Sequence, residues 1–117
     1  QYYRDLCEFA NGYTIERVIV DPSASSFKTV IKQDGKFIVR DANNDVLDGI
    51  RFTASMISSG LVRFHSSCVN VFAEFGAYVW DETKNEDAVI KENDHAMDAM
   101  RYFMYTVIAR EKRAGVF

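Results

Sequence analysis

The sequence predicts an α/β fold in which a mainly parallel sheet is flanked by helices. Three short apolar runs, at 17–20, 36–40 and 61–65, alternate with longer segments whose apolar residues recur at helical spacing. Alternation of this kind is typical of strands that are joined by helices, which favours parallel pairing. The chain has 117 residues, is 48% hydrophobic and contains a single proline, so we expect one folded domain over residues 1–117.

Each element of the N-terminal part is indicated by an apolar period and by the residues that stop it. Asn11-Gly12 closes a first helix, Pro22 ends a first strand, and Asp34-Gly35 forms a turn. In order, the predicted elements are a helix before residue 12, a buried strand at 17–20, a helix or helical turn at 23–33, and a second strand at 36–40.

The C-terminal part is predicted in the same way. Asp45 is a good N-cap for a helix, Gly60 ends that helix, and Ser66 or Ser67 caps the next one. The predicted elements are a helix at about 46–59, a third strand at 61–65, a helix that ends at 80–82, a polar loop at 83–91, and a final helix at about 94–110.

The start of the final helix carries the clearest chemical signal. His95 and Asp98 lie three residues apart, so on a helix they share one face at about 60° from each other, with Asp94 beside them. An imidazole and a carboxylate on one helix face suit a metal ion. The alternative interpretation is a solvated helix start, in which acids favour the positive end of the helix dipole.

A second group of acids follows predicted strands. Asp21 comes directly after the strand at 17–20, where α/β sheets commonly place their chemistry, and Ser23 follows it. Asp41 follows the second strand in the same manner and is a secondary candidate. The alternative for Asp21 is a capping role in a turn that ends the strand. His65, at the end of the third predicted strand, is interpreted as a surface or capping residue.

Composition excludes some function classes. The net charge is −3 and the sequence pI is about 5.3, which argues against a module that binds DNA through bulk positive charge. It does not exclude a nuclease, because carboxylates hold metals and the metals neutralise phosphate. Cys7 and Cys68 lack metal-type spacing and are interpreted as buried free thiols. No signal peptide or membrane-length apolar run is present.

Four short segments, at 20–24, 44–50, 78–82 and 92–102, together resemble the C-terminal nuclease domain of tailed-phage terminase large subunits. Their order and spacing fit, and the resemblance covers nearly the whole chain. It implies a ribonuclease H-like fold and an endonuclease that cuts concatemeric viral DNA with divalent metals. It also implies double-stranded DNA, the terminase small subunit and the portal as partners, and the cytoplasm of the bacterial host as the location.

By this resemblance, Asp21 matches the acid on the second catalytic strand, and His95 and Asp98 match the pair on the last helix. These residues would hold two Mg²⁺ or Mn²⁺ ions, with His95 as a ligand or a proton-handling group. An imidazole ligand favours Mn²⁺. Asp45 and Asp48 lie in the segment 44–50, but we interpret them as helix-start capping and packing residues.

The chain also departs from the family pattern. Family members carry a first catalytic aspartate on an opening strand, whereas only twenty residues precede Asp21 here and they predict a helix that contains Asp5. No Walker-type glycine-rich loop is present. We therefore expect a fragment that is weak or inactive alone, and that self-associates through the strand at 17–20, because the missing strand would leave an apolar edge.

Two rival functions stay open at this stage. Another ribonuclease H-like enzyme, such as a junction resolvase or transposase core, shares the metal logic but does not account for the segment 44–50. A structural or DNA-contacting fragment without activity is the second rival. Plasmid cleavage with Mn²⁺, compared with Asp21→Ala and Asp98→Ala, discriminates between these interpretations.

Overall fold

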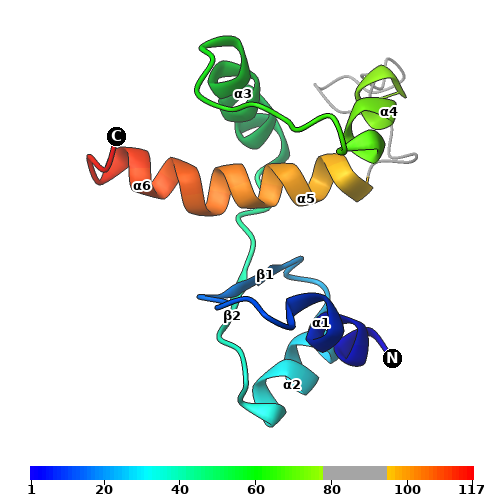
Figure 1. The fold of residues 1–117 in the computed structure, drawn as a ribbon. Coiled ribbons are helices and arrows are strands. Elements are labelled where there is room, and N and C mark those ends of the chain that lie inside the picture. The colour runs from blue at the N-terminus through cyan, green and yellow to red at the C-terminus, as the bar shows by residue number, and fades with distance from the viewer. Residues whose placement is uncertain (78–94) are drawn as a thin grey trace, which may run out of the picture. The chain divides into compact units, whose positions relative to one another are not determined.

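The computed structural model describes residues 1–77 and 95–117, and these divide into two units, Gln1–Ala42 and Asn43–Phe117. Figure 1 shows the elements of each unit. In chain order they are α1 (Tyr2–Ala10), β1 (Val18–Val20), α2 (Ser25–Asp34), β2 (Val39–Asp41), α3 (Val46–Ser58), α4 (Val69–Ala77), α5 (His95–Phe103), the π-helix η1 (Met104–Ile108) and α6 (Ala109–Arg113).

The N-terminal unit is built around one strand–helix–strand connection. Strands β1 and β2 are parallel, with Val18 opposite Val39 and Val20 opposite Asp41, and α2 joins them. Parallel strands need such a crossover because the end of the first strand and the start of the second lie at opposite ends of the sheet. The core consists of Val20, Ile31 and Val39, against which these partly buried side chains pack: Tyr3, Leu6, Val18, Phe27 and Phe37.

Local signals in this unit were interpreted correctly. The first helix ends next to Asn11, β1 lies inside the predicted strand, and α2 ends at Gly35, whose φ of 74° is left-handed and suits glycine. The second strand is shifted, since β2 begins at Val39 rather than at residue 36. The pairing register explains this, because Val39 is the partner of Val18, with which β1 begins.

The C-terminal unit is helical in its described residues. Figure 1 shows α5, η1 and α6 as one continuous helix, with α3 and α4 beside it. Helix α3 packs along α5 and η1, and α4 packs against α5. The most buried apolar side chains here come from α3 and from this long helix, and they are Met56, Met97, Met104 and Ala109. Met97 and Met104 of the long helix are therefore part of the core.

The predicted strand at 61–65 is wrong. Residues 62–65 form an irregular segment, and the described part of this unit contains no strand that could pair with them. Gly60 (φ 77°) ends α3 in a Schellman motif, in which the Leu61 N–H donates to the Met56 carbonyl. Phe64 then packs edge-to-face on Phe75 of α4. The alternating apolar residues of this segment therefore pack against helices rather than on one face of a sheet.

The final helix also differs from the simple prediction. It runs to Arg113 and contains the π-helical turn Met104–Ile108. Within that turn, the Thr106 hydroxyl accepts a hydrogen bond of 2.8 Å from the Asn43 N–H, and the Tyr105 ring lies 6.0 Å from that of Phe52. These contacts attach the start of the unit and α3 to the long helix.

Several other predictions have defined outcomes. Cys7 and Cys68 are both free thiols, and both are half-buried. Among the described helices, none combines the length and the apolar character needed to cross a bilayer. The predicted end of the fourth helix at 80–82, the polar loop at 83–91 and the candidate Asp94 lie outside the described residues.

Candidate functional site

Asp21 occupies the carboxyl end of β1, as the sequence predicted. Its Oδ1 accepts two hydrogen bonds from Ser23, one from the backbone N–H at 2.8 Å and one from the hydroxyl at 2.7 Å. This is an Asx-type turn, in which a side chain takes the place of a backbone acceptor. Ser23 therefore fixes the orientation of the Asp21 carboxylate. Asp21 is half-buried, which limits its freedom further.

A lysine accompanies this strand end. Lys28 projects from α2, and its Nζ donates to Asp41 Oδ1 at 2.8 Å and to the Pro22 carbonyl at 2.9 Å. The Lys28 side chain is 18% exposed and that of Asp41 is 56% exposed. Because Asp41 lies opposite Val20 in the sheet, the two strand-end acids occupy the same edge. Lys28 thus balances the charge of the Asp41 carboxylate and also holds the turn that carries Asp21.

The second half of the candidate site lies at the start of α5. His95 is the first residue of the helix and is exposed, and Asp98 follows one turn later and is half-buried. Glu74 of α4 accepts a hydrogen bond of 3.0 Å from the Met97 N–H. A carboxylate at this position satisfies an N–H of the first turn and complements the helix dipole. The helix start is therefore held by a neighbouring helix.

Arg101 lies beside Asp98 on the same helix. Its Nη2 is 3.3 Å from Asp98 Oδ1, and its Nη1 is 3.2 Å from Asn44 Oδ1. The Arg101 side chain is only 3% exposed, whereas that of Asp98 is 23% exposed. Asn44 and Asp98, which are distant in sequence, therefore both bond to this guanidinium within the C-terminal unit.

Of the residues interpreted as capping groups, Asp45 has that role at α3, whereas α4 begins at Val69 and so directly follows Cys68 rather than Ser66 or Ser67. Asp45 is the N-cap of α3, and its side chain accepts a hydrogen bond of 3.1 Å from the Asp48 N–H. The Asp48 carboxylate lies 3.8 Å from Arg51 on the exposed side of the helix. His65 Nδ1 lies 3.1 Å from the Ser67 N–H and 2.9 Å from its hydroxyl, so this ring stabilises the turn before α4.

The donor set fits a hard divalent cation. Carboxylate oxygens suit Mg²⁺ and Mn²⁺, and an imidazole adds preference for Mn²⁺. Asp21 lies in the N-terminal unit, and His95 and Asp98 lie in the C-terminal unit. Within the described ranges 1–77 and 95–117, no three His, Cys, Asp or Glu side chains gather closely enough to hold an ion. Convergence of Asp21, His95 and Asp98 stays a prediction.

Comparison with known proteins decides the family. The model of the terminase RNaseH-like domain matches residues 10–106, which include Asp21, His95 and Asp98. The chain belongs to this family. The predicted ribonuclease H-like class is therefore confirmed, and the parallel β1–β2 pair is part of that fold. The resemblance that was inferred from the four short segments is confirmed as well.

Individual relatives agree with this assignment. The terminase large subunit of Escherichia phage T5 is 26% identical over 101 residues, covering 81% of the chain and 23% of the relative. The large terminase of a thermophilic bacteriophage, solved with ADP and with ATP-γ-S, is 42% identical with a TM-score of 0.86. That match covers 92% of this chain and 28% of the solved chain. The terminase family member described here thus spans about a quarter of its relatives' length.

Some residues of this terminase domain were missed by sequence reasoning. Lys28, Glu74 and Arg101 each contact a candidate acid or its helix, yet none was singled out as part of a site. Lys28 and Glu74 come from neighbouring helices, and no local spacing identifies such partners. Arg101 did have a signal, since it lies three residues after Asp98 and so on the same helix face.

Proposed function

We propose that this chain forms part of the metal-dependent endonuclease of a large terminase, which cuts concatemeric viral DNA during genome packaging. Family membership supports the nuclease class. The observation that carries the proposal is the pair of supported acids, with Asp21 held by Ser23 at the end of β1 and Asp98 held by Arg101 on α5. Carboxylates fixed in this manner are the ligands that a divalent-metal nuclease needs.

In this proposal Asp21, Asp98 and His95 serve one site with two Mg²⁺ or Mn²⁺ ions. Asp21 binds one side and Asp98 the other, while His95 ligates an ion or handles a proton. When bound, such ions supply an activated water and stabilise the departing 3′ oxygen. Ser23 keeps the Asp21 carboxylate in one orientation, so less conformational freedom is lost when an ion binds. His95 is exposed, which leaves its ring accessible to solvent and substrate.

Asp41 has a different role in this scheme. Its carboxylate is engaged by Lys28 at 2.8 Å, so we assign it to balancing that cation rather than to metal binding. Lys28 also holds the Pro22 carbonyl, directly after Asp21. The ammonium group therefore supports the turn on which the proposed ligand lies. Loss of Asp41 should weaken metal binding less than loss of Asp21.

The proposed substrate is double-stranded DNA, and the proposed partners are the terminase small subunit and the portal. These partners are what the resemblance to terminase large subunits implies, and the family match supports that resemblance. The net charge of −3 does not oppose a DNA substrate, because bound divalent ions offset phosphate charge at the site of cleavage.

The proposal is tested by Mn²⁺ titration calorimetry and by plasmid cleavage. Both are measured for the 117-residue chain and for the longest open reading frame that contains it. Asp21→Asn and Asp98→Asn should each abolish cleavage and weaken Mn²⁺ binding at least tenfold, because each removes a charged ligand. Asp48→Asn, an exposed acid of α3, is the matched control and should change neither.

The two outcomes that reject the proposal are specific. Cleavage that persists in both Asp21→Asn and Asp98→Asn would show that these acids do not hold the catalytic ions. A loss of Mn²⁺ binding in only one of the two would show that they do not share a site. His95→Ala should reduce the preference for Mn²⁺ over Mg²⁺, since it removes the softer ligand.

A structural or DNA-contacting role without catalysis is the second candidate. It is favoured by the division of the proposed ligands between the two units, since Asp21 belongs to one unit and His95 and Asp98 belong to the other. Under this alternative, the chain would bind DNA in a gel mobility-shift assay that contains no Mn²⁺. Neither Asp21→Asn nor Asp98→Asn would alter that binding. Metal-dependent nicking by the longer open reading frame would reject it.

A further inference from the structure

Arg101 is a buried cation whose contacts within the described residues join the proposed metal ligand to a distant segment. The residue is 2% exposed, and its guanidinium donates to Asp98 Oδ1 and to Asn44 Oδ1 through different terminal nitrogens. A buried charge is costly unless an opposite charge and hydrogen bonds compensate it. Asp98 supplies that charge, so the position of its carboxylate is coupled to the position of the guanidinium.

Gly49 makes room for this arginine. A Cβ at this position would lie 2.8 Å from Arg101 Cγ and 3.0 Å from Cδ. These atoms belong to the inner part of the arginine stem, which cannot move aside without carrying the guanidinium with it. Gly49 is buried inside α3, where a glycine is unfavourable for the helix itself. Its presence there is explained by the passage of the Arg101 stem.

One further donor of the guanidinium bears on its role. Arg101 Nε is buried and has no hydrogen-bond partner among the residues that the structure describes. A guanidinium placed only for stability would be expected to satisfy all its buried donors. Because Arg101 Nε lacks such a partner there, hydrogen bonding by the guanidinium does not by itself explain why Arg101 is placed beside Asp98. Arg101 cannot ligate a metal, because a guanidinium has no acceptor.

We propose that Arg101 is a positioning residue of the metal site. It fixes the Asp98 carboxylate through Oδ1, while Asn44 and Gly49 hold the guanidinium in place. The inference rests on the proposed function and gives a role to the segment 44–50, which lies far from Asp98 in sequence. Residues that orient metal ligands commonly contribute about 10- to 100-fold to metal affinity. Arg101 has two opposing effects on metal affinity. It raises the affinity by orienting Asp98, and it lowers the affinity because its positive charge repels the metal ion.

The first test separates orientation from charge. Mn²⁺ affinity is measured by titration calorimetry on the folded 117-residue chain, for Arg101→Lys and Arg101→Gln. Both should weaken Mn²⁺ binding about tenfold, because neither side chain reproduces the fork between Asp98 and Asn44. Arg51→Gln, which alters an exposed arginine of α3, is the matched control and should leave the affinity unchanged.

The second test removes no polar group. Gly49→Ala should weaken Mn²⁺ binding several-fold by displacing the Arg101 stem, whereas Ser55→Ala on the exposed side of α3 should not. In the Arg101→Ala background, Gly49→Ala should cause no further loss, because the stem it would displace is absent. This non-additivity identifies Gly49 as acting through Arg101.

Each outcome has a defined meaning. If Arg101→Gln bound Mn²⁺ as tightly as the unsubstituted chain, or more tightly, repulsion would dominate and the inference would be overturned. A fall in thermal stability with unchanged Mn²⁺ affinity would make Arg101 merely structural. If neither the unsubstituted chain nor the longest open reading frame that contains it bound Mn²⁺, the proposed function would be rejected, and with it this inference.

Discussion

Asp45 shows how one side chain determines the start of an element. Its carboxylate accepts from the Asp48 N–H and satisfies one of the donors that the first turn of α3 would otherwise leave unpaired. The acids of this chain are thus divided among several roles. Asp45 caps a helix, Asp41 balances Lys28, and Asp21 and Asp98 are held by Ser23 and Arg101.

Asp45→Ala should destabilise the C-terminal unit by about 1 kcal/mol, the usual cost of losing an N-cap. Asp45→Asn keeps an acceptor at the same position and should be nearly neutral. Urea unfolding followed by circular dichroism measures both. Equal destabilisation by the two substitutions would show that the charge of Asp45, rather than its capping hydrogen bond, stabilises α3.

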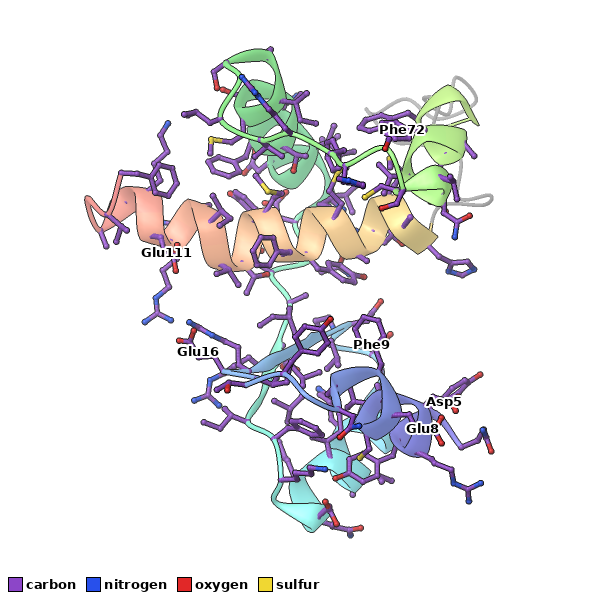
Figure 2. The ribbon with its side chains drawn as sticks, viewed as in Figure 1. Asp5, Glu8, Phe9, Glu16, Phe72 and Glu111 are labelled. Carbon is purple, nitrogen blue, oxygen red and sulfur yellow. The ribbon has the colours of Figure 1, made fainter. Side chains whose placement is uncertain are left out.

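At the scale of elements, α1 is attached to α2 by side chains rather than by backbone bonds. The Tyr3 hydroxyl donates to the Asp34 carboxylate, and the Tyr3 ring packs edge-to-face on Phe37. Tyr2 makes a similar contact with Phe27. Figure 2 shows Asp5, Glu8 and Phe9 projecting outward from α1. Asp5 is exposed and accepts a hydrogen bond from Gln1, and it lies on a helix rather than on a strand.

The attachment of α1 should weaken at alkaline pH. The hydrogen bond to Asp34, followed by partial desolvation and by the Cys7 thiol, raises the pKa of Tyr3 well above its ordinary value of 10.0. A pKa that is higher in the folded state stabilises the fold fully below pH 10, and this contribution is lost as the pH rises through the folded-state pKa. Amide exchange in α1 should therefore accelerate above pH 10.

Absorbance at the phenolate band, compared between the chain and Tyr3→Phe, measures the Tyr3 titration directly. The pH dependence of α1 exchange should disappear in Tyr3→Phe, apart from the intrinsic base catalysis of exchange. Titration of Tyr3 at the same pH in the folded chain and in urea would contradict the raised pKa.

The segment 61–65 illustrates where element prediction failed. Alternating apolar residues satisfy the period of a strand, but a strand also needs a hydrogen-bonding neighbour. The described part of the C-terminal unit contains only helices, so Val62 and Phe64 bury against them while the backbone stays irregular. In contrast, the helix predictions succeeded because helical hydrogen bonds are local and need no distant partner.

At the scale of the whole molecule, the sheet has an open edge in the described residues. Val18 and Val20 bond with β2, as the Val18 N–H donates to Ile38 and the Val20 carbonyl accepts from Ala42. Alternate residues of a parallel strand face opposite edges, so the Ile19 N–H faces away from β2. Within residues 1–77 and 95–117, β2 is the only strand paired with β1.

We therefore predict that the 117-residue chain self-associates through β1. Size-exclusion chromatography with light scattering should show oligomers that increase with concentration. Ile19→Pro removes the outward N–H without removing a bond to β2 and should shift the chain toward monomer. Ile19→Val keeps the N–H and is the matched control. A monomeric chain at high concentration would show that the edge does not recruit a partner.

The sequence alone determined the presence of the helices, the N-cap of α3, the glycines that end α2 and α3, the two strands of the N-terminal unit and the family. Each of these depends on local periods, on capping and turn residues such as Asp45, Gly35 and Gly60, or on motifs contiguous in the chain. Such signals act over a few residues, so they can be recognised without knowing what lies nearby in space.

Only the tertiary structure decided which side chains support the acids. Lys28 reaches Asp41 from a neighbouring helix, Glu74 caps α5 from α4, and Gly49 admits the stem of Arg101. Nothing in the local spacing of these residues distinguishes them from ordinary surface or helix positions. Their roles arise because packing brings distant segments together, and a buried charge such as Arg101 must then find its partner among the groups that packing supplies.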